Sequence, residues 1–453
     1  MVAALGATFL GSLDALMVVT ALPSAAQDIG GVGLISIAIG AAMVTIVMTL
    51  PLAGGMIDRY GAARSFAIAC ILFAVANVLG GLAQSMAMVA FSRAILGLGA
   101  GFMFAVPIGL FALYIPDALR PRAFGLNAAM WGVSAAIGPA LGAGLTGSIG
   151  WRWVFWINLP MIAIVAFAGR LALRRHPARP ASPDISINLV GPALIALTVL
   201  PLLLTADDPR WAILALPAAA AFVVHERRTA TPVFTHRPVS LAANAASLSA
   251  GAAFLGAEVY LPLQIQVGFG ESIAVVALAL VLATIGWTAG SMGAARFDAA
   301  PGDQILLGSS IVFVSVLAMA LPFGGALMPV LGYGLAGIGM GIASPALFGA
   351  VLNDGERGRE GRSTSSVPLS RQVGAGLGTA IAGIVFAISL SDAAIRASER
   401  DGAHVAAVVP AARHTYLAAA LLGAIAVIAC HWLRQAPHRG GRAVDAKPDR
   451  VAA

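Results

Sequence analysis

Long apolar runs recur along this chain and constrain its fold more than any other feature. Each run has about 20 residues, enough for a helix to cross the roughly 30 Å hydrocarbon core of a bilayer. The whole chain is 59% hydrophobic and only 10% charged, whereas soluble domains carry about 25% charged residues. A water-soluble fold could not cover this apolar surface. The sequence therefore predicts an all-α polytopic membrane protein.

Polar, glycine-rich or proline-rich loops divide the apolar runs into fourteen predicted spans. They are 3–25, 34–53, 66–84, 88–113, 123–146, 153–170, 188–204, 211–225, 241–264, 273–292, 304–321, 327–351, 372–390 and 413–432. The seventh and eighth are short and contain prolines. Twelve spans with two interfacial segments are therefore an alternative.

Basic residues are distributed unevenly between the two sides of these spans. Lysine and arginine are retained preferentially in cytoplasmic loops. With the N-terminus inside, the outer segments hold five of the 27 basic residues, Arg93 lies within a span, and the cytoplasmic segments hold the other 21. This asymmetry predicts an even number of spans with both termini in the cytoplasm. It also explains the net charge of +7 without a nucleic acid partner.

Three ionisable residues are predicted to lie well within spans: Asp14, Arg93 and Glu258. A charge at the bilayer centre costs at least about 2.5 kcal/mol, so such residues usually pair or line a wet cavity. Asp14 and Arg93 lie at depths that let the arginine reach the carboxylate, in a pair that is either proton-coupling or purely structural. Glu258 has no basic residue in its own span. It is either a proton carrier or a glutamate facing water in an outer vestibule.

The sequence offers little for enzymatic chemistry. Lys447 is the sole lysine and no G-x-x-x-x-G-K-[ST] motif occurs, which argues against nucleotide hydrolysis. The seven histidines form no ligand pair at helical spacing, and the two cysteines lie in apolar runs without metal-ligand spacing. We therefore expect no enzyme activity, no metal and no cofactor.

Three motifs in the first half of the chain carry a family likeness. Segment 54–64, GGMIDRYGAAR, is similar to the G-x-x-x-D-R-x-G-R-[KR] loop of the major facilitator superfamily, with alanine in place of the second arginine. The resemblance implies a conformational latch made of Gly54, Asp58, Arg59, Gly61 and Arg64. In physical terms, Asp58 can cap a neighbouring helix N-terminus and pair with arginines.

The fourth and fifth predicted spans carry the other two motifs. Segment 91–99, FSRAILGLG, resembles R-x-x-x-G-x-G, whose arginine is associated with proton coupling in the family. Segment 132–144 resembles the family's antiporter motif, with Gly132, Gly138, Pro139 and Gly142 at the matching positions. Glycine and proline there suit a kinked, closely packed gating helix. The resemblance favours export over uptake.

Three more segments resemble the fourteen-span drug:proton antiporter branch of this family. They are LD … ALP at 13–23, YLPLQIQ at 260–266 and RQVG at 371–374. Leu16 and Val19 replace a threonine and an asparagine of that branch, which makes one cavity wall more apolar. The resemblance covers residues 5–390 approximately.

The resemblance implies a major facilitator fold with two six-helix bundles and two extra central transmembrane helices. The expected divisions are an N-terminal bundle at 1–172, a linker with the two extra helices at 173–238, a C-terminal bundle at 239–435 and a disordered basic tail at 436–453. Substrate would bind between the two bundles, which rock alternately.

The implied function is proton-coupled antiport that exports small amphipathic or lipophilic compounds across a bacterial inner membrane. Asp14, Glu258 and Arg93 would couple protons, and the substrate cavity would include Tyr260, Gln264, Gln266, Asn127 and Trp131. The expected partners are the substrate, protons and the lipid bilayer, with a monomeric protein driven by the proton gradient. Alternatives are a dedicated exporter of one native metabolite or lipid, proton-coupled uptake, and a non-transporting receptor on the same fold.

Overall fold

The computed structural model describes residues 1–116, 119–174, 186–203, 210–294, 296, 299–356, 358–397 and 403–435. Twelve helical segments within these residues are long and apolar enough to cross a membrane. The predicted all-α, multi-span class is therefore confirmed. The predicted tail at 436–453 lies outside the described residues, and the domain boundaries stay predictions.

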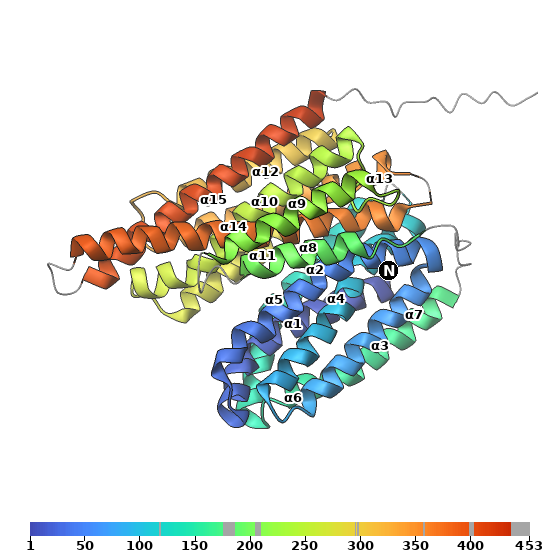
Figure 1. The fold of residues 1–453 in the computed structure, drawn as a ribbon, viewed down its shortest axis with the longest axis horizontal. Coiled ribbons are helices and arrows are strands. Elements are labelled where there is room, and N and C mark those ends of the chain that lie inside the picture. The colour runs from blue at the N-terminus through green and yellow to red at the C-terminus, as the bar shows by residue number, and fades with distance from the viewer. Residues whose placement is uncertain are drawn as a thin grey trace, which may run out of the picture.

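Seven helices form the N-terminal half, coloured blue to cyan-green in Figure 1. They are α1 (Val2–Ile29), α2 (Ile35–Tyr60), α3 (Ala62–Gly81), α4 (Met86–Tyr114), α5 (Arg120–Ser148), α6 (Trp153–Trp156) and α7 (Asn158–Arg174). Helix α4 packs against α2 and α3, and α1 packs against α5 and α7. Small residues allow these close approaches, as at Gly97, where an added Cβ would clash with the backbone of Ala42.

Six α-helices form the C-terminal half: α10 (Pro238–Leu263), α11 (Ile273–Ala294), α12 (Pro301–Met319), α13 (Leu327–Asp354), α14 (Glu360–Ala397) and α15 (Ala403–Gln435). A π-helical turn, η4 (Gln264–Gly268), extends α10. Helix α10 packs against α14 and α15, and α13 packs against α11 and α12.

The two halves meet mainly along two helix pairs, α2 with α14 and α5 with α11, and also where α4 meets α14 and α5 meets α13. In Figure 1 their ribbons lie together near Met1 and diverge toward α6. We call the side where α2 ends the Asp58 end and the opposite side the α6 end. At the Asp58 end the stacked rings of Phe124 and Phe348, 5.0 Å apart between centroids, join α5 to α13.

A helical hairpin lies between the two halves in the sequence. It consists of α8 (Val190–Leu203) and α9 (Trp211–Arg228), which pack against each other, while α8 also packs against α2 and α14. Neither helix is among the twelve candidate spans. The structure thus supports twelve of the fourteen predicted spans, and the fourteen-span count stays a prediction.

Helix α14 begins earlier than the predicted span at 372–390. Its first turns contain the serine- and threonine-rich segment 363–366, which resembles a loop in composition. There the Thr364 hydroxyl donates to the Glu360 carbonyl at 2.8 Å, as mid-helix hydroxyls often do. Arg371 therefore lies roughly 16 Å along the helix axis from Glu360, the first residue of α14, at 1.5 Å per residue. The expectation of only three ionisable residues well within spans was wrong, because Arg371 is a fourth.

Candidate functional site

The predicted pair Asp14 and Arg93 forms at the centre of the N-terminal half. The Arg93 guanidinium on α4 donates to Oδ2 of Asp14 on α1 at 2.8 Å. The amide of Asn158, at the start of α7, donates to Oδ1 at 2.7 Å. Asp14 is 0% exposed, so both carboxylate oxygens are bound inside the bundle.

Sequence reasoning missed two asparagines beside this pair. The Asn158 amide also lies 2.9 Å from Oδ1 of Asn77 on α3, and the Asn77 amide donates to the Phe73 carbonyl at 2.9 Å. Both asparagines are fully buried. The sequence did offer a signal for these two residues, which is a neutral amide side chain within an apolar run. Such a side chain indicates a hydrogen-bonded partner nearby, because buried polar groups need hydrogen-bond partners.

Glu258 occupies a different environment in the C-terminal half. Its Oε2 accepts a hydrogen bond from Oη of Tyr333 on α13 at 2.7 Å. The Glu258 side chain is partly exposed, whereas Tyr333 is buried and its ring stacks on Phe254 at 4.6 Å. Among the described residues no arginine or histidine forms an ion pair with Glu258. Its carboxylate is therefore held by a phenol instead of a cation.

Two of the predicted cavity residues are committed to hydrogen bonds within their own half. Oδ1 of Asn127 on α5 accepts from the Thr8 hydroxyl of α1 at 2.6 Å. Gln264 is buried, and its Oε1 accepts from Oη of Tyr416 on α15 at 2.8 Å. Contact of either side chain with substrate stays a prediction.

The other three predicted cavity residues are more open. Trp131 is 39% exposed, and its ring lies 5.3 Å from that of Phe104 on α4. Tyr260 stacks on Phe386 of α14 at 4.6 Å, and Gln266 is partly exposed in the π-helical turn. Such turns occur frequently at functional sites. The accessible side chains of this set are therefore mainly aromatic.

Asp58 caps a helix of the opposite half. Its Oδ1 accepts from the backbone N–H of Gly361 at 2.7 Å, and its Oδ2 accepts from that of Arg362 at 2.9 Å. These are the free N–H groups of the first turn of α14, so the carboxylate also lies at the positive end of the helix dipole. The predicted capping is confirmed. The expected arginine partners are absent from these two bonds, which both go to backbone.

The other predicted latch residues divide into two groups. Gly54 allows α2 to touch α14, because an added Cβ would clash with Ser365 and lie 2.6 Å from the Gly361 carbonyl oxygen. Gly61, Arg59 and Arg64 lie at the α2–α3 turn, where Gly61 has a φ of +85°. The Arg59 guanidinium lies 5.2 Å from the Tyr60 ring, and Arg64 is exposed. Gly54 and Asp58 thus make the contacts between halves.

The antiporter-motif glycines contact both halves. An added Cβ at Gly138 would lie 2.9 Å from Leu16, and one at Gly142 would lie 2.6 Å from the Met17 carbonyl oxygen, so both pack against α1. Gly132 faces α11 instead, with the Thr288 hydroxyl 3.2 Å from its hypothetical Cβ. Pro139 lies inside α5 between these contacts. The motif therefore sets the approach of α5 to its own half and to the other.

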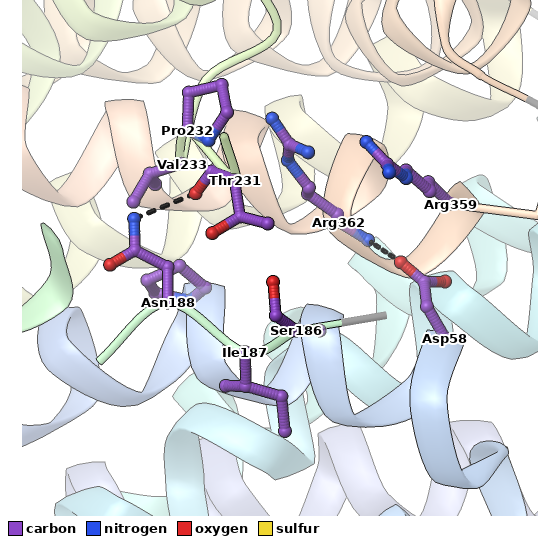
Figure 2. Close-up of a pocket in the computed structure, with 11 residues that line it drawn as sticks. Asp58, Ser186, Ile187, Asn188, Thr231, Pro232, Val233, Arg359 and Arg362 are labelled. Carbon is purple, nitrogen blue, oxygen red and sulfur yellow. Dashed lines mark hydrogen bonds between the residues drawn. The ribbon is translucent and has the colours of Figure 1, made fainter. Parts of the chain in front are cut away.

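The ends of the α8–α9 hairpin lie against Asp58. Figure 2 shows a small cavity there, lined by Pro51, Gly55, Asp58, Ser186, Ile187, Asn188, Thr231, Pro232, Val233, Arg359 and Arg362. The Asn188 amide ties the two ends of the hairpin together by donating to the Thr231 carbonyl at 2.8 Å. Glu226 near the end of α9, outside the candidate spans, accepts from the Phe234 N–H, and burial raises the pKa of its carboxyl. Sequence reasoning attached no role to this segment.

Comparison with known proteins assigns the family. The model of the Major Facilitator Superfamily matches residues 4–379. The chain therefore belongs to the major facilitator superfamily of membrane transporters, and the recognition made from its motifs is confirmed.

Curated relatives are similar at modest identity. An "Uncharacterized MFS-type transporter" of Mycobacterium tuberculosis is 29% identical over 87% of this chain, which spans only 60% of that relative's length. A "Probable multidrug-efflux transporter" of the same species is 27% identical, covering 96% of this chain and 94% of the relative. The solved human organic anion transporter MFSD10 is 18% identical, with a TM-score of 0.65 over 93% of this chain and 99% of that one. This last likeness shows the fold alone.

Proposed function

We propose that this chain is a proton-coupled antiporter that exports small amphipathic or lipophilic compounds by alternating access. Glu258 is its principal proton carrier, and Asp14 with Arg93 forms a second coupling site. The protein acts as a monomer in a bacterial inner membrane and uses the proton gradient without a cofactor. The multidrug-efflux name of one relative and the antiporter-type glycines of α5 support the direction of transport.

The state of Glu258 is the observation that carries this proposal. It is a partly exposed carboxylate within a candidate span, bonded by Tyr333 and by no cation among the described residues. A charge at membrane depth is costly, so an intramembrane carboxylate without a cation marks a functional site. Such a group can take up a proton on one side of the membrane and release it on the other.

The contacts at the Asp58 end support a specific conformation. With fourteen spans and both termini in the cytoplasm, the Asp58 end faces the cytoplasm. The cap that Asp58 makes on α14 and the close approach at Gly54 then seal the cytoplasmic side. The conformation is therefore outward-facing, and inward opening requires these contacts to break.

Proton release in inverted membrane vesicles tests the proposal. A pH-sensitive acridine dye reports loss of the proton gradient when a lipophilic substrate is added. We expect release with the parent and none with Glu258→Gln, which keeps the shape of the side chain but cannot carry a proton. Glu271→Gln provides a matched control, because Glu271 is an exposed glutamate in the loop that follows η4.

The same assay on Asp14→Asn separates the two carboxylates. Proton release lost only in Glu258→Gln names Glu258 as the carrier, and loss in both variants makes the two sites interdependent. Unchanged release in both variants, with a responsive parent, would remove the coupling assignment. Substrate accumulation in the opposite direction would support uptake in place of export.

A further inference from the structure

Arg371 lies within the candidate membrane span of α14, in a motif that the proposed function leaves without a role. Its guanidinium carbon lies 5.2 Å from the centre of the Trp287 ring on α11. Both side chains are partly exposed. An arginine over an indole is a favourable cation–π arrangement that leaves the N–H edges of the guanidinium free to bind another group.

The packing of the helices locates this contact on the C-terminal half. Helix α14 packs against α2 and helix α11 packs against α5, so these two flank the face that meets the N-terminal half. Helices α12 and α15 cover α10 and α13 from the other side. A side-chain contact from α14 to α11 therefore crosses the face between the two halves, where substrate passes in alternating access.

Close backbone packing fixes where the arginine stands. An added Cβ at Gly251 of α10 would lie 2.6 Å from the Arg371 carbonyl oxygen. The motif's glycine, Gly374, makes a similar contact, because its Cβ would clash with the Leu248 carbonyl. The two glycines hold α10 against α14. The guanidinium is therefore presented from a rigid part of the bundle.

No carboxylate among the described residues neutralises Arg371. Asp14 is bound by Arg93 in the other half, and Glu258 is bound by Tyr333. Arginine suits planar acids because it binds a carboxylate through two parallel N–H donors. An intramembrane cation without an internal partner therefore calls for an anionic ligand.

Aromatic rings continue from the Arg371–Trp287 contact into the C-terminal half. Phe254 contacts Trp287 edge to face at 5.6 Å and stacks on Tyr333 at 4.6 Å. A continuous series of contacts thus joins Arg371 to the Glu258 carboxylate through three rings. Phe254 is 4% exposed and Tyr333 is 1% exposed, whereas Trp287 is partly exposed, so the indole is the ring of this series that a flat, apolar molecule can contact.

We infer that Arg371 binds the acidic group of the transported compound, and that the substrate class is aromatic molecules bearing a carboxylate or a similar anion. This inference rests on the proposed transport function and narrows it. The acid lies against Arg371, and the aromatic body lies against the exposed part of the Trp287 ring. Glu258 lies at the other end of this series of rings and supplies the proton site without touching the acid.

Equilibrium binding to the full chain in detergent tests the inference without requiring transport. The probes share one ring system and differ in charge: 2-naphthoate, 2-naphthamide and 2-naphthylmethylammonium. We expect calorimetry to show that naphthoate binds about tenfold more tightly than naphthamide. One hydrogen bond to a charged group supplies about this difference in affinity. Arg371→Gln should abolish this preference and Arg371→Lys should keep part of it. Arg170→Gln, at an exposed arginine of α7, should not change it.

Three outcomes overturn the inference: no naphthoate binding to the parent, a parent that prefers the ammonium probe, or an unchanged preference in Arg371→Gln. Thermal unfolding of each variant shows whether the fold survives, and Arg371→Lys provides a second variant if the glutamine does not. Proton release in vesicles separates this result from the proposed function. Arg371-dependent naphthoate binding without proton-driven transport would reject antiport alone, whereas proton-driven export without preference for the acid would reject the substrate class alone.

Discussion

The two halves of the protein hold their intramembrane charges in opposite ways. In the N-terminal half, Asp14 and Arg93 neutralise each other at 2.8 Å inside the bundle. In the C-terminal half, Glu258 and Arg371 are each in contact with an aromatic residue, Tyr333 or Trp287, and neither forms an ion pair among the described residues. We therefore expect the first site to contribute more to stability, beside its proposed coupling role, and the second to exchange protons and ligands.

Asp14→Ala should have the largest effect on stability. Removing one partner of a buried ion pair leaves the other charge uncompensated, which costs about 3–5 kcal/mol. Thermal unfolding of the purified protein should therefore show a large fall in Tm. The double variant Asp14→Ala with Arg93→Ala removes the stranded charge and should recover part of the loss. Strictly additive losses would mean that the two residues are not coupled.

Asn158→Ala should have the next largest effect. It leaves Oδ1 of Asp14 and Oδ1 of Asn77 without this donor, and an unsatisfied buried polar group costs about 1–3 kcal/mol. Asn127→Ala is the control, because Asn127 is partly exposed and its side chain accepts one hydrogen bond, from the Thr8 hydroxyl. The same unfolding assay should rank Asn158→Ala well below Asn127→Ala in Tm. An equal effect would show that the asparagines contribute little to the N-terminal site.

The sequence predicted the N-terminal pair and the Asp58 cap because each carries a strong local signal. A charge in an apolar run is costly, and depth along each span indicates which charges can meet. The Asp58 loop lies between two long apolar runs, so its position at a helix terminus could be expected. The helix that it caps could not be predicted, because Gly361 on α14 is 303 residues away from Asp58 in the chain.

Other features gave no such signal. Asn77 and Asn158 are neutral, and their meeting depends on how α3 and α7 pack, which no local pattern specifies. The start of α14 was missed because its serines and threonines are typical of loops, yet their hydroxyls bond to preceding carbonyls and Asp58 supplies a cap from another helix. Arg371 was assigned to a span boundary for the same reason. An error in one helix start thus concealed an intramembrane charge.

Tyr333→Phe should have a smaller effect on stability than either N-terminal change. It removes one donor to Glu258, whose partly exposed carboxylate can bind water instead, so we expect a loss of about 1 kcal/mol. Tyr60→Phe at the end of α2 is the control, because Tyr60 is 37% exposed. A loss as large as that of Asp14→Ala would mean that the C-terminal carboxylate is as tightly integrated as the N-terminal one.

Glu258→Gln should change stability least, and its contrast with Asp14→Asn is the most direct test of the difference between the halves. Both substitutions keep the side-chain shape and remove one negative charge. At Asp14 the change strands Arg93, so Tm should fall clearly. At Glu258 no cation is stranded and the glutamine oxygen can still accept from Tyr333, so we expect a change within about 0.5 kcal/mol, as for a site without an essential partner.

Thermal unfolding and the vesicle assay, applied to the same two variants, then distinguish the roles. A stable Glu258→Gln protein that has lost proton release would assign the C-terminal carboxylate to transport alone. An Asp14→Asn protein that is destabilised yet still releases protons at permissive temperature would assign the N-terminal pair to structure alone. If Glu258→Gln unfolds as readily as Asp14→Asn, Glu258 is a structural charge too, and the difference between the halves lies in geometry and not in role.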